Sequence, residues 1–383
     1  MKDTILFGDC KDTLKTIAPQ SARVCVTSPP YYGLRDYGTA TWIGGDPNCK
    51  HRKVGKQGSN CITGHKKHDD MGSVGDYIFK SVCPLCGAVR QDSQIGLEET
   101  PEEYIESLVS VFREVRNALT DDGTLWVNLG DSYYNYRPGK GQSLVKQSVS
   151  KTKQDLPDNC NRRANKLEGL KEKDLIGIPW MFAFAMRNDG WYLRQDIIWH
   201  KPNPMPESVK DRCTKSHEYL FLLSKNKKYY FDNEAIKEPV KKDWGTRNRD
   251  NGKYHNKGTG LQPHSGLTKS YTTKNKRSVW SITNKPYKGS HFATFPPDLV
   301  EPCILSGSRV SDIILDPFMG SGTTAMVAKS LGRKYLGCEL HDDYSKLIEK
   351  RINSVTVNKV SQAENNPLES LLYYECTKEI TND

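Results

Sequence analysis

The sequence predicts an α/β protein whose sheet is largely parallel. The last quarter of the chain reads as a βαβα unit, with strand 313–315, a glycine-rich loop, helix 323–331, strand 335–339 and helix 343–352. A second observation is a helix that Thr100 and Glu103 can cap around Pro101, with apolar residues recurring on one face. Because a strand at 124–129 follows this helix, helices and strands alternate as parallel pairing requires.

The remaining elements are predicted from apolar runs and chain breakers. The run at 24–27 indicates a buried strand that stops before Pro29 and Pro30, since proline has no N–H to give to a ladder. We expect Asp122-Gly123 to end the capped helix. Further elements are a helix at 178–188 and strands at 191–199 and 218–223.

Composition limits the class of protein. The 383 residues suffice for one large domain with insertions, or for two domains. The formal net charge of +10 suits a polyanionic partner such as nucleic acid, although a plain basic surface explains it equally well. With neither a long apolar run nor a signal-peptide pattern, we expect a cytoplasmic protein without a membrane partner. Eleven cysteines in such a protein favour reduced thiols or a metal site over a disulfide framework.

Two polar, basic segments interrupt the periodic sequence. Residues 137–174 carry ten Lys and Arg against five Asp and Glu, and this composition predicts a flexible basic insertion. Residues 241–277 carry ten against two and include Trp244 and Tyr254, a mixture able to reach phosphates and base edges. A solvated charged loop is the alternative for either segment.

The loop between strand 313–315 and the next helix is a candidate ligand site. Its sequence, DPFMGSGTT, lets the backbone approach a ligand closely, yet it matches neither the dinucleotide nor the triphosphate glycine motif. Asp316 ends this strand, and Glu339 ends the following one, where a carboxylate can accept hydrogen bonds from both hydroxyls of a ribose. A tight turn without a ligand is the alternative reading.

A second motif, Ser-Pro-Pro-Tyr, follows the strand at 24–27. Four residues alone occur often by chance, but together with DPFMGSGTT they resemble the two halves of the amino-methyltransferases of DNA, in the permuted β-group arrangement. Segments 123–128, 199–206, 277–280 and 291–296 extend the resemblance. It implies a Rossmann-like, S-adenosylmethionine-dependent methyltransferase sheet that is circularly permuted, with the catalytic half before the cofactor half.

The resemblance also implies roles for individual residues. The residues that it places at the cofactor are Asp9, Thr294, Asp316, Phe318, Gly320, Gly322, Thr323 and Glu339. The residues that it makes catalytic are Ser28, Pro29, Pro30 and Tyr31.

These catalytic residues suit methylation of an exocyclic base amine. Such an amine is a poor nucleophile because its lone pair is delocalised into the ring, and acceptors at the Ser28 oxygen and the Pro29 carbonyl would draw the nitrogen toward sp³. The ring of Tyr31 would stack on a base flipped out of double-stranded DNA. In the family, Ser before Pro-Pro-Tyr usually goes with cytosine N4 and Asp with adenine N6, so we expect N4-methylation of cytosine.

Three other functions remain open at this point. Adenine N6 methylation uses the same acceptors, an RNA or protein methyltransferase keeps the fold and the cofactor, and an inactive DNA-binding module needs only the basic segments. Methylation at cytosine C5 is disfavoured, because Cys25 lies within the apolar strand and no Pro-Cys nucleophile motif occurs. A restriction endonuclease partner is compatible with the resemblance.

Segment 37–94 has no periodicity and contains a CxxC motif followed by glycine. Cys83 and Cys86 have the spacing of a zinc knuckle. We favour Cys49 and His51 as the second pair of ligands, with Cys61 and His65 as alternatives, and a site with four protein ligands would be structural. Free thiols or a redox pair are the other readings.

The domain organisation that follows has eight parts. They are the start of the catalytic half (1–36), a zinc-knuckle-like insertion (37–94), methyltransferase segments (95–136 and 175–238), the flexible insertion (137–174), a target-recognition region (239–278), the cofactor half (279–356) and a C-terminal tail (357–383).

Overall fold

A computed structural model gives the fold of the chain. The residues that the structure describes are 2–33, 41–49, 54–55, 77–78, 82–83, 85–91, 93–134, 167, 169–240, 272–284 and 295–355. Most of the two basic segments, together with His51 and Thr294, therefore lies outside the described residues.

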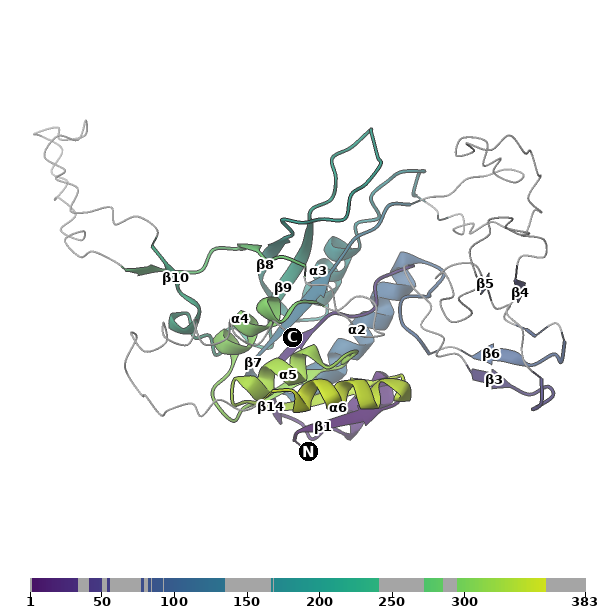
Figure 1. Ribbon diagram of the computed structural model, residues 1–383, viewed down its shortest axis with the longest axis horizontal. Helices are drawn as coiled ribbons and strands as arrows, with labels where there is room; N and C mark the ends of the chain where they lie inside the picture. Colours follow the sequence, from purple (N-terminus) through teal and green to yellow (C-terminus); the bar gives the residue numbers. More distant parts are fainter. Residues whose placement is uncertain are drawn as a thin grey trace, which may run out of the picture.

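An eight-stranded sheet forms the centre of the molecule (Figure 1). In spatial order its strands are β1 (Thr4–Phe7), β14 (Lys334–Glu339), β13 (Ile313–Asp316), β2 (Ala22–Thr27), β7 (Leu119–Leu129), β9 (His217–Ser224), β8 (Tyr192–His200) and β12 (Val279–Ser281). The first five run parallel to one another, and within this sheet only β9 runs in the opposite direction. The prediction of a largely parallel α/β sheet is confirmed.

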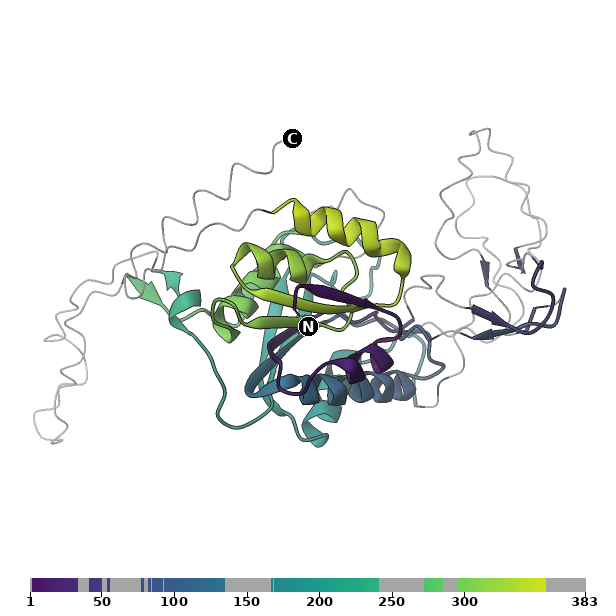
Figure 2. The ribbon, with the colours of Figure 1, turned by 90° about the horizontal axis from the view of Figure 1, so that it is seen from below.

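Helices cover both faces of this sheet (Figure 2). They are α1 (Cys10–Thr13), α2 (Pro101–Ala118), α3 (Ile178–Asn188), α4 (Pro297–Gly307), α5 (Thr323–Ser330) and α6 (Ser345–Asn353). The first three enclose one apolar core with the sheet, and α4 and α5 enclose a second core on the opposite face. Because β2 is covered on both sides, most of its residues are buried, as is typical of a central parallel strand.

The capped helix is α2, and its start follows the prediction. Thr100 accepts from the backbone of Glu103, and the Glu103 side chain accepts from the backbone of Thr100, which completes a capping box. Its end does not follow the prediction, because the helix stops at Ala118 and β7 begins at Leu119. The register of β7 against β2 shifts between the pairs Ala22–Leu119 and Val24–Thr124, so Asp122-Gly123 lies in an irregular part of the strand. An added Cβ at Gly123 would stand 2.9 Å from the carbonyl oxygens of both Arg23 and Thr120, so this close approach of backbone requires glycine.

Short elements complete the described chain. The antiparallel pairs are β3 (Thr41–Ile43) with β6 (Val89–Gln91), β4 (Val54–Gly55) with β5 (Tyr77–Ile78), and β10 (Glu238–Pro239) with β11 (Thr273–Lys274). The 3₁₀ turns are Leu14–Thr16, Glu234–Ile236 and Asp342–Tyr344. No helix among the described residues is both long enough and apolar enough to cross a bilayer.

Candidate active site

The two sequence motifs meet at one edge of the sheet. Strand β13 lies between β2 and β14, with Leu315 opposite Cys25 on one side and Leu336 on the other. All three strands point the same way, so the segments that follow them emerge together at their carboxyl ends. Ser28, Asp316 and Glu339 are thereby brought to a common edge, as the sequence predicts.

Asp316 is fully buried and organises this edge from within. Its Oδ1 accepts from Thr27 Oγ1 at 2.6 Å and from the backbone N–H of Phe318 at 3.0 Å. Its Oδ2 accepts from Thr324 Oγ1 at 2.7 Å. Burial raises the pKa of Asp316 to about 6, although these three donors oppose the shift. The carboxylate is therefore committed to protein partners on β2, on the glycine loop and on α5.

Glu339 ends β14 and faces the same loop. Its Oε2 accepts from the Gly320 N–H at 2.7 Å, and its Oε1 accepts from the His341 N–H at 2.9 Å. Burial raises the pKa of Glu339 to about 7, against the effect of these two donors. Since each carboxylate oxygen has two lone pairs, each has one left to accept from a ligand hydroxyl.

The glycine loop owes its shape to backbone conformations that favour glycine. Gly320 and Gly322 have φ values of 53° and 81°, and Gly322 is the N-cap of α5. The loop is attached to the neighbouring strand where the Met319 N–H donates to the Cys338 carbonyl at 2.9 Å. Phe318 turns inward, with its ring centroid 6.5 Å from that of Phe112 on α2.

The other residues expected at the cofactor divide into three cases. Asp9 follows β1, the strand next to β14, and caps α1 by accepting from the Lys11 N–H at 2.8 Å. Thr323 is buried in the first turn of α5, with its hydroxyl oxygen 3.5 Å from that of Ser321. Thr294 lies outside the described residues.

The Ser-Pro-Pro-Tyr segment lies against side chains from β7 and β9. Tyr31 Oη is 2.8 Å from Glu218 Oε2 and 3.0 Å from Asn128 Oδ1. Ser28 Oγ is 3.4 Å from the same Asn128 oxygen, a long contact. The Pro30 carbonyl accepts from Tyr104 Oη at 2.8 Å, so helix α2 fixes the second proline of the motif.

Sequence reasoning assigned no role to Thr27, Asn128 or Glu218. Asn128 ends a segment that we noted only for its resemblance, and Glu218 stands at the start of an apolar strand. A charged residue opening a buried strand was the available signal. It was not sufficient, because the partners of Glu218 come from distant parts of the chain.

Three cysteines of segment 37–94 converge. The Sγ atoms of Cys49, Cys83 and Cys86 all lie within 4.8 Å of one another, and those of Cys49 and Cys83 are 3.9 Å apart. The CxxC turn is closed by the Cys83 N–H donating to Ala88 O at 2.7 Å and by the Gly87 N–H donating to Cys83 O at 2.9 Å. Three of the four expected ligands are thus brought together, and His51 lies outside the described residues.

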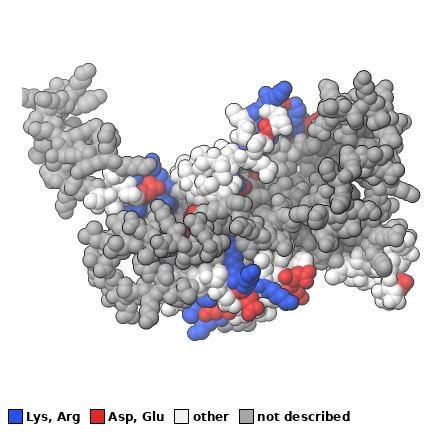
Figure 3. Space-filling model, in the orientation of Figure 1, with Lys and Arg blue, Asp and Glu red and all other residues white. Residues whose placement is uncertain are grey.

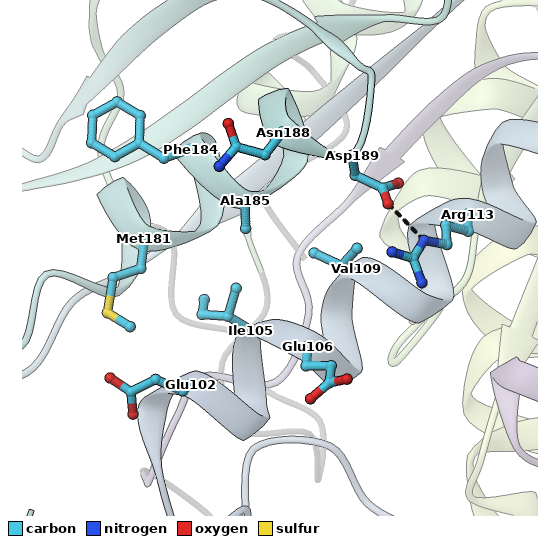
Figure 4. Close-up of a pocket in the computed structure, with 10 residues that line it drawn as sticks. All are labelled: Glu102, Ile105, Glu106, Val109, Arg113, Met181, Phe184, Ala185, Asn188 and Asp189. Atoms are coloured by element: carbon cyan, nitrogen blue, oxygen red, sulfur yellow. Dashed lines mark hydrogen bonds and ion pairs between the residues drawn. The ribbon is translucent and has the colours of Figure 1, made fainter.

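A recess of about 640 Å³ lies elsewhere, between α2 and α3 (Figure 4). Its floor is apolar, and its rim carries Glu102, Glu106 and the Arg113–Asp189 ion pair. None of its lining residues belongs to the edge described above.

Figure 3 shows that the described Lys and Arg of one face are interspersed with Asp and Glu, so the described residues form no continuous basic area on that face.

The fold and the site define a Rossmann-like α/β protein with its ligand edge at the carboxyl ends of β2, β13 and β14. A family model described as DNA methylase (N6_N4_Mtase) matches residues 22–350. The chain belongs to this DNA methylase family.

Individual relatives agree with the family. The Type II methyltransferase M.SmaI of Serratia marcescens is 40% identical over 353 residues, which cover 91% of this chain and 90% of that protein. The Type II methyltransferase M.Cfr9I of Citrobacter freundii is 37% identical over 357 residues, 93% and 90% of the two chains. A solved structure described as PvuII DNA methyltransferase (cytosine-N4-specific) shares the fold, with a TM-score of 0.51 and 15% identity over 98% of this chain and 92% of that one.

Proposed function

We propose that this DNA methylase transfers a methyl group from S-adenosylmethionine to the exocyclic N4 of a cytosine flipped out of double-stranded DNA. The observation that carries the proposal is the hydrogen bond between Thr27, which precedes Ser-Pro-Pro-Tyr, and Asp316, which opens the glycine loop. This bond joins the ends of adjacent strands, β2 before Ser-Pro-Pro-Tyr and β13 before the glycine loop. The base that accepts the methyl group and the cofactor that donates it would therefore meet at one edge.

The residues at the edge fit a nucleoside cofactor with a sulfonium group. When bound, S-adenosylmethionine supplies an electrophilic methyl group. Glu339 offers lone pairs to ribose hydroxyls, and the positive φ angles of Gly320 and Gly322 turn the loop at this edge. We propose that Asp9, Thr294, Phe318 and Thr323 complete this cradle. We propose that Asp316 also belongs to the cradle, because its Oδ1 accepts from Thr27 and Phe318 and its Oδ2, which accepts only from Thr324 among the described residues, keeps a lone pair.

The methyl acceptor would lie over Ser28 and Pro29. The Pro29 carbonyl accepts no hydrogen bond from the described residues, whereas the Pro30 carbonyl is occupied by Tyr104. Ser28 Oγ and the Pro29 carbonyl would therefore accept the two amine hydrogens, and Pro30 would serve to fix the turn. Cytosine is preferred to adenine because Ser28 occupies the position where adenine enzymes of the family usually carry Asp.

The wider organisation belongs to the same proposal. The chain runs from the catalytic strand to the cofactor strand, and β1 at its start pairs with β14 near its end, which favours a circularly permuted sheet. We retain the eight segments defined above, with 239–278 as the target-recognition region. A cytoplasmic location and a restriction endonuclease that cuts the same sequence fit this function.

Mass-resolved nucleoside analysis of DNA from cells expressing the chain tests the base. N4-methylcytosine is expected, and Ser28→Ala should lose most of the transfer rate while still binding S-adenosylmethionine. N6-methyladenine without methylated cytosine would replace the base assignment by its first alternative. If no base is methylated, the result favours the alternative of a DNA-binding module.

We further propose that Cys49, Cys83 and Cys86 hold a structural zinc ion, with His51 as the fourth ligand. Thiolates around a tetrahedral zinc with bonds of about 2.3 Å lie roughly 3.8 Å apart, close to the 3.9 Å between Cys49 and Cys83. Gly45 lets the backbone pass the site, since an added Cβ there would stand 2.8 Å from Cys86 Sγ. The antiparallel pair of β3 and β6 has few buried apolar residues among those described, so a metal would supply the missing stabilisation.

Metal analysis of the purified full chain should find about one zinc ion per molecule. Cobalt substitution should give thiolate-to-cobalt absorption that Cys83→Ser abolishes. Cys213→Ser is the matched control, because this exposed cysteine lies outside the cluster and its loss should leave the metal content unchanged. A metal-free preparation in which β3 and β6 are fully folded would overturn the zinc assignment without bearing on methylation.

A further inference from the structure

Behind Tyr31 lies a cluster of polar side chains that the roles above do not use. Tyr31 Oη is 2.8 Å from Glu218 Oε2, and Lys201 Nζ donates to Glu218 Oε1. Asn128 joins from the other side, with its Oδ1 3.0 Å from the Tyr31 hydroxyl. The cluster therefore joins the segment after β2 to the end of β7, the start of β9 and the residue after β8.

The orientation of Asn128 decides how these bonds run. Its Nδ2 faces two acceptors, Glu218 Oε2 at 3.2 Å and the Tyr219 carbonyl at 3.1 Å, so its Oδ1 is left to face Tyr31. The Tyr31 hydroxyl has one hydrogen and two acceptors in reach. A carboxylate is the stronger acceptor, so Tyr31 donates to Glu218.

The surroundings of the Tyr31 hydroxyl suppress its ionisation. Burial raises the pKa of Tyr31 well above its ordinary value, and the neighbouring charge of Glu218 adds to the shift. The hydroxyl therefore stays protonated throughout the range in which proteins are studied. It serves as a permanent donor, and not as an acid or base.

The ring of Tyr31 is confined as well. It packs against bare backbone at Gly130, where an added Cβ would stand 2.6 Å from Cε2 of the ring. The backbone of Tyr31 is closely packed too, since an added Cβ at Gly96 would stand 3.1 Å from the Tyr31 carbonyl oxygen. The side chain is thus held by its hydroxyl and packed along its ring, while the residue as a whole remains only half-buried.

The Glu218–Lys201 ion pair is itself shielded. The two side chains retain 16% and 17% of their exposure, and a carboxylate this far from water needs a charged partner. Lys201 also lies 4.2 Å from the centroid of the Trp199 ring, and Trp199 is the register partner of Glu218 across β8 and β9. Glu218 on β9 and Lys201, directly after β8, are therefore attached to the sheet, and we call this pair the anchor of Tyr31.

We propose that Glu218 and Lys201 are positioning residues that hold the Tyr31 ring where an extruded base would stack on it. This inference rests on the proposed function, because only an extruded base needs such a platform. Losing the anchor should let the ring swing and slow methyl transfer. Binding of S-adenosylmethionine should be unaffected, because the carboxylates expected at the cofactor lie on β13 and β14.

The first experiment needs no activity. A single 3-fluorotyrosine is placed at position 31 of the full chain, and its ¹⁹F resonance is recorded. Glu218→Gln and Lys201→Met should shift or broaden it, whereas Lys201→Arg, which keeps the charge, should largely restore it. Asp189→Asn is the matched control, since Asp189 is also a shielded partner in an ion pair, with Arg113 at 2.6 Å, but lines the distant recess. A resonance that ignores Glu218→Gln overturns the proposal.

The second experiment measures single-turnover methyl transfer to unmethylated DNA. Tyr31→Phe and Glu218→Gln should each slow transfer by roughly 10- to 100-fold with an unchanged dissociation constant for S-adenosylmethionine. Because both substitutions act on the same hydrogen bond between Tyr31 and Glu218, the double variant should be no slower than the slower single variant. Fully additive losses would overturn the proposal. If the unaltered protein transfers no methyl group while the ¹⁹F result holds, the proposed function fails and the anchor stands.

Discussion

Thr27 Oγ1 donates a 2.6 Å hydrogen bond to Asp316 Oδ1, and both residues are buried. The two partners are 289 positions apart in the sequence, yet they end neighbouring strands of the sheet. Through this bond, the residue before Ser-Pro-Pro-Tyr is connected directly to the residue that opens the glycine loop. A substitution of either residue should therefore alter the structure of both motifs.

Thr27→Val removes the donor and keeps the shape of the side chain. We expect the free energy of unfolding to fall by roughly 1 to 3 kcal/mol, because a buried acceptor loses a partner. Thr27 opposes the raised pKa of Asp316, so its loss should raise that pKa further. Ionised Asp316 would then be disfavoured, and the destabilisation should be larger at about pH 8 than at about pH 5. Urea denaturation at both pH values measures it, with Thr27→Ser as the control that retains the hydroxyl.

Binding of S-adenosylmethionine should depend on the ionisation of Glu339. The pKa of this residue is raised to about 7 in the folded protein, and under the proposed function its ionised form would accept hydrogen bonds from ribose hydroxyls. Affinity should therefore rise with pH, by up to about tenfold per pH unit, and level off above about pH 7. Titration calorimetry between about pH 5.5 and about pH 8 tests this.

The stability of the ligand-free protein should follow the opposite course. Because burial raises the pKa of Glu339 above 4.5, this group stabilises the fold at low pH, and that contribution is lost as the pH rises through about 7. Glu339→Gln should remove the pH dependence of affinity and that of stability which are due to Glu339. Any dependence that the variant keeps then comes from other groups, such as histidines. An affinity that is equally pH-dependent in the parent and in Glu339→Gln would show that another group is responsible.

Gly130→Ala tests the confinement of the Tyr31 ring. The new methyl group would stand 2.6 Å from the ring, too close for the present position, so the ring must move. We expect methyl transfer to fall by roughly 10- to 100-fold while affinity for S-adenosylmethionine stays within a factor of about two. The double variant Gly130→Ala, Tyr31→Ala should be no slower than Tyr31→Ala alone, because Gly130→Ala acts only through the ring that Tyr31→Ala removes. A full rate in Gly130→Ala would show that the ring position is unimportant.

The capping box of α2 contributes to stability and not to chemistry. Thr100→Ala should lower the free energy of unfolding by about 1 kcal/mol, because the first turn of the helix loses an acceptor for a backbone N–H. The transfer rate at a temperature where the variant is folded should match the parent. Thr100→Ser, which keeps the oxygen, should restore the stability in thermal denaturation.

The secondary structure around the site was largely predictable. Strand β2, helix α2 and the unit from β13 to α6 lie within a few residues of their predicted bounds, because apolar periodicity and capping residues are local signals. Helix α4 and strand β1 were not predicted. Strand β1 is only four residues long, and α4 contains Pro302, which argues locally against a helix.

The failure at Asp122-Gly123 has a tertiary cause. In isolation this dipeptide favours a turn, but Arg23 on β2 forms an ion pair with Asp122, and the β2 backbone leaves no room for a side chain at Gly123. Neither residue has a register partner in the ladders of β7, so packing against β2, and not ladder pairing, keeps this irregular stretch within the strand. The role of Glu218 could not be predicted from the sequence for a similar reason, because its partners Lys201 and Tyr31 are brought to it only by the tertiary fold.

The sequence by itself determined the two motifs, the order in which they occur and the alternation of helices and strands, because each of these is written in short stretches of residues. Only the tertiary structure decided which side chains face the site and which support it from below. Asp316 accepts hydrogen bonds from three protein groups at the edge where the sequence expects the cofactor, while the Tyr31 hydroxyl lies within reach of Glu218 and Asn128. The physical reason is that burial and hydrogen-bond partners depend on strands that pair across hundreds of residues.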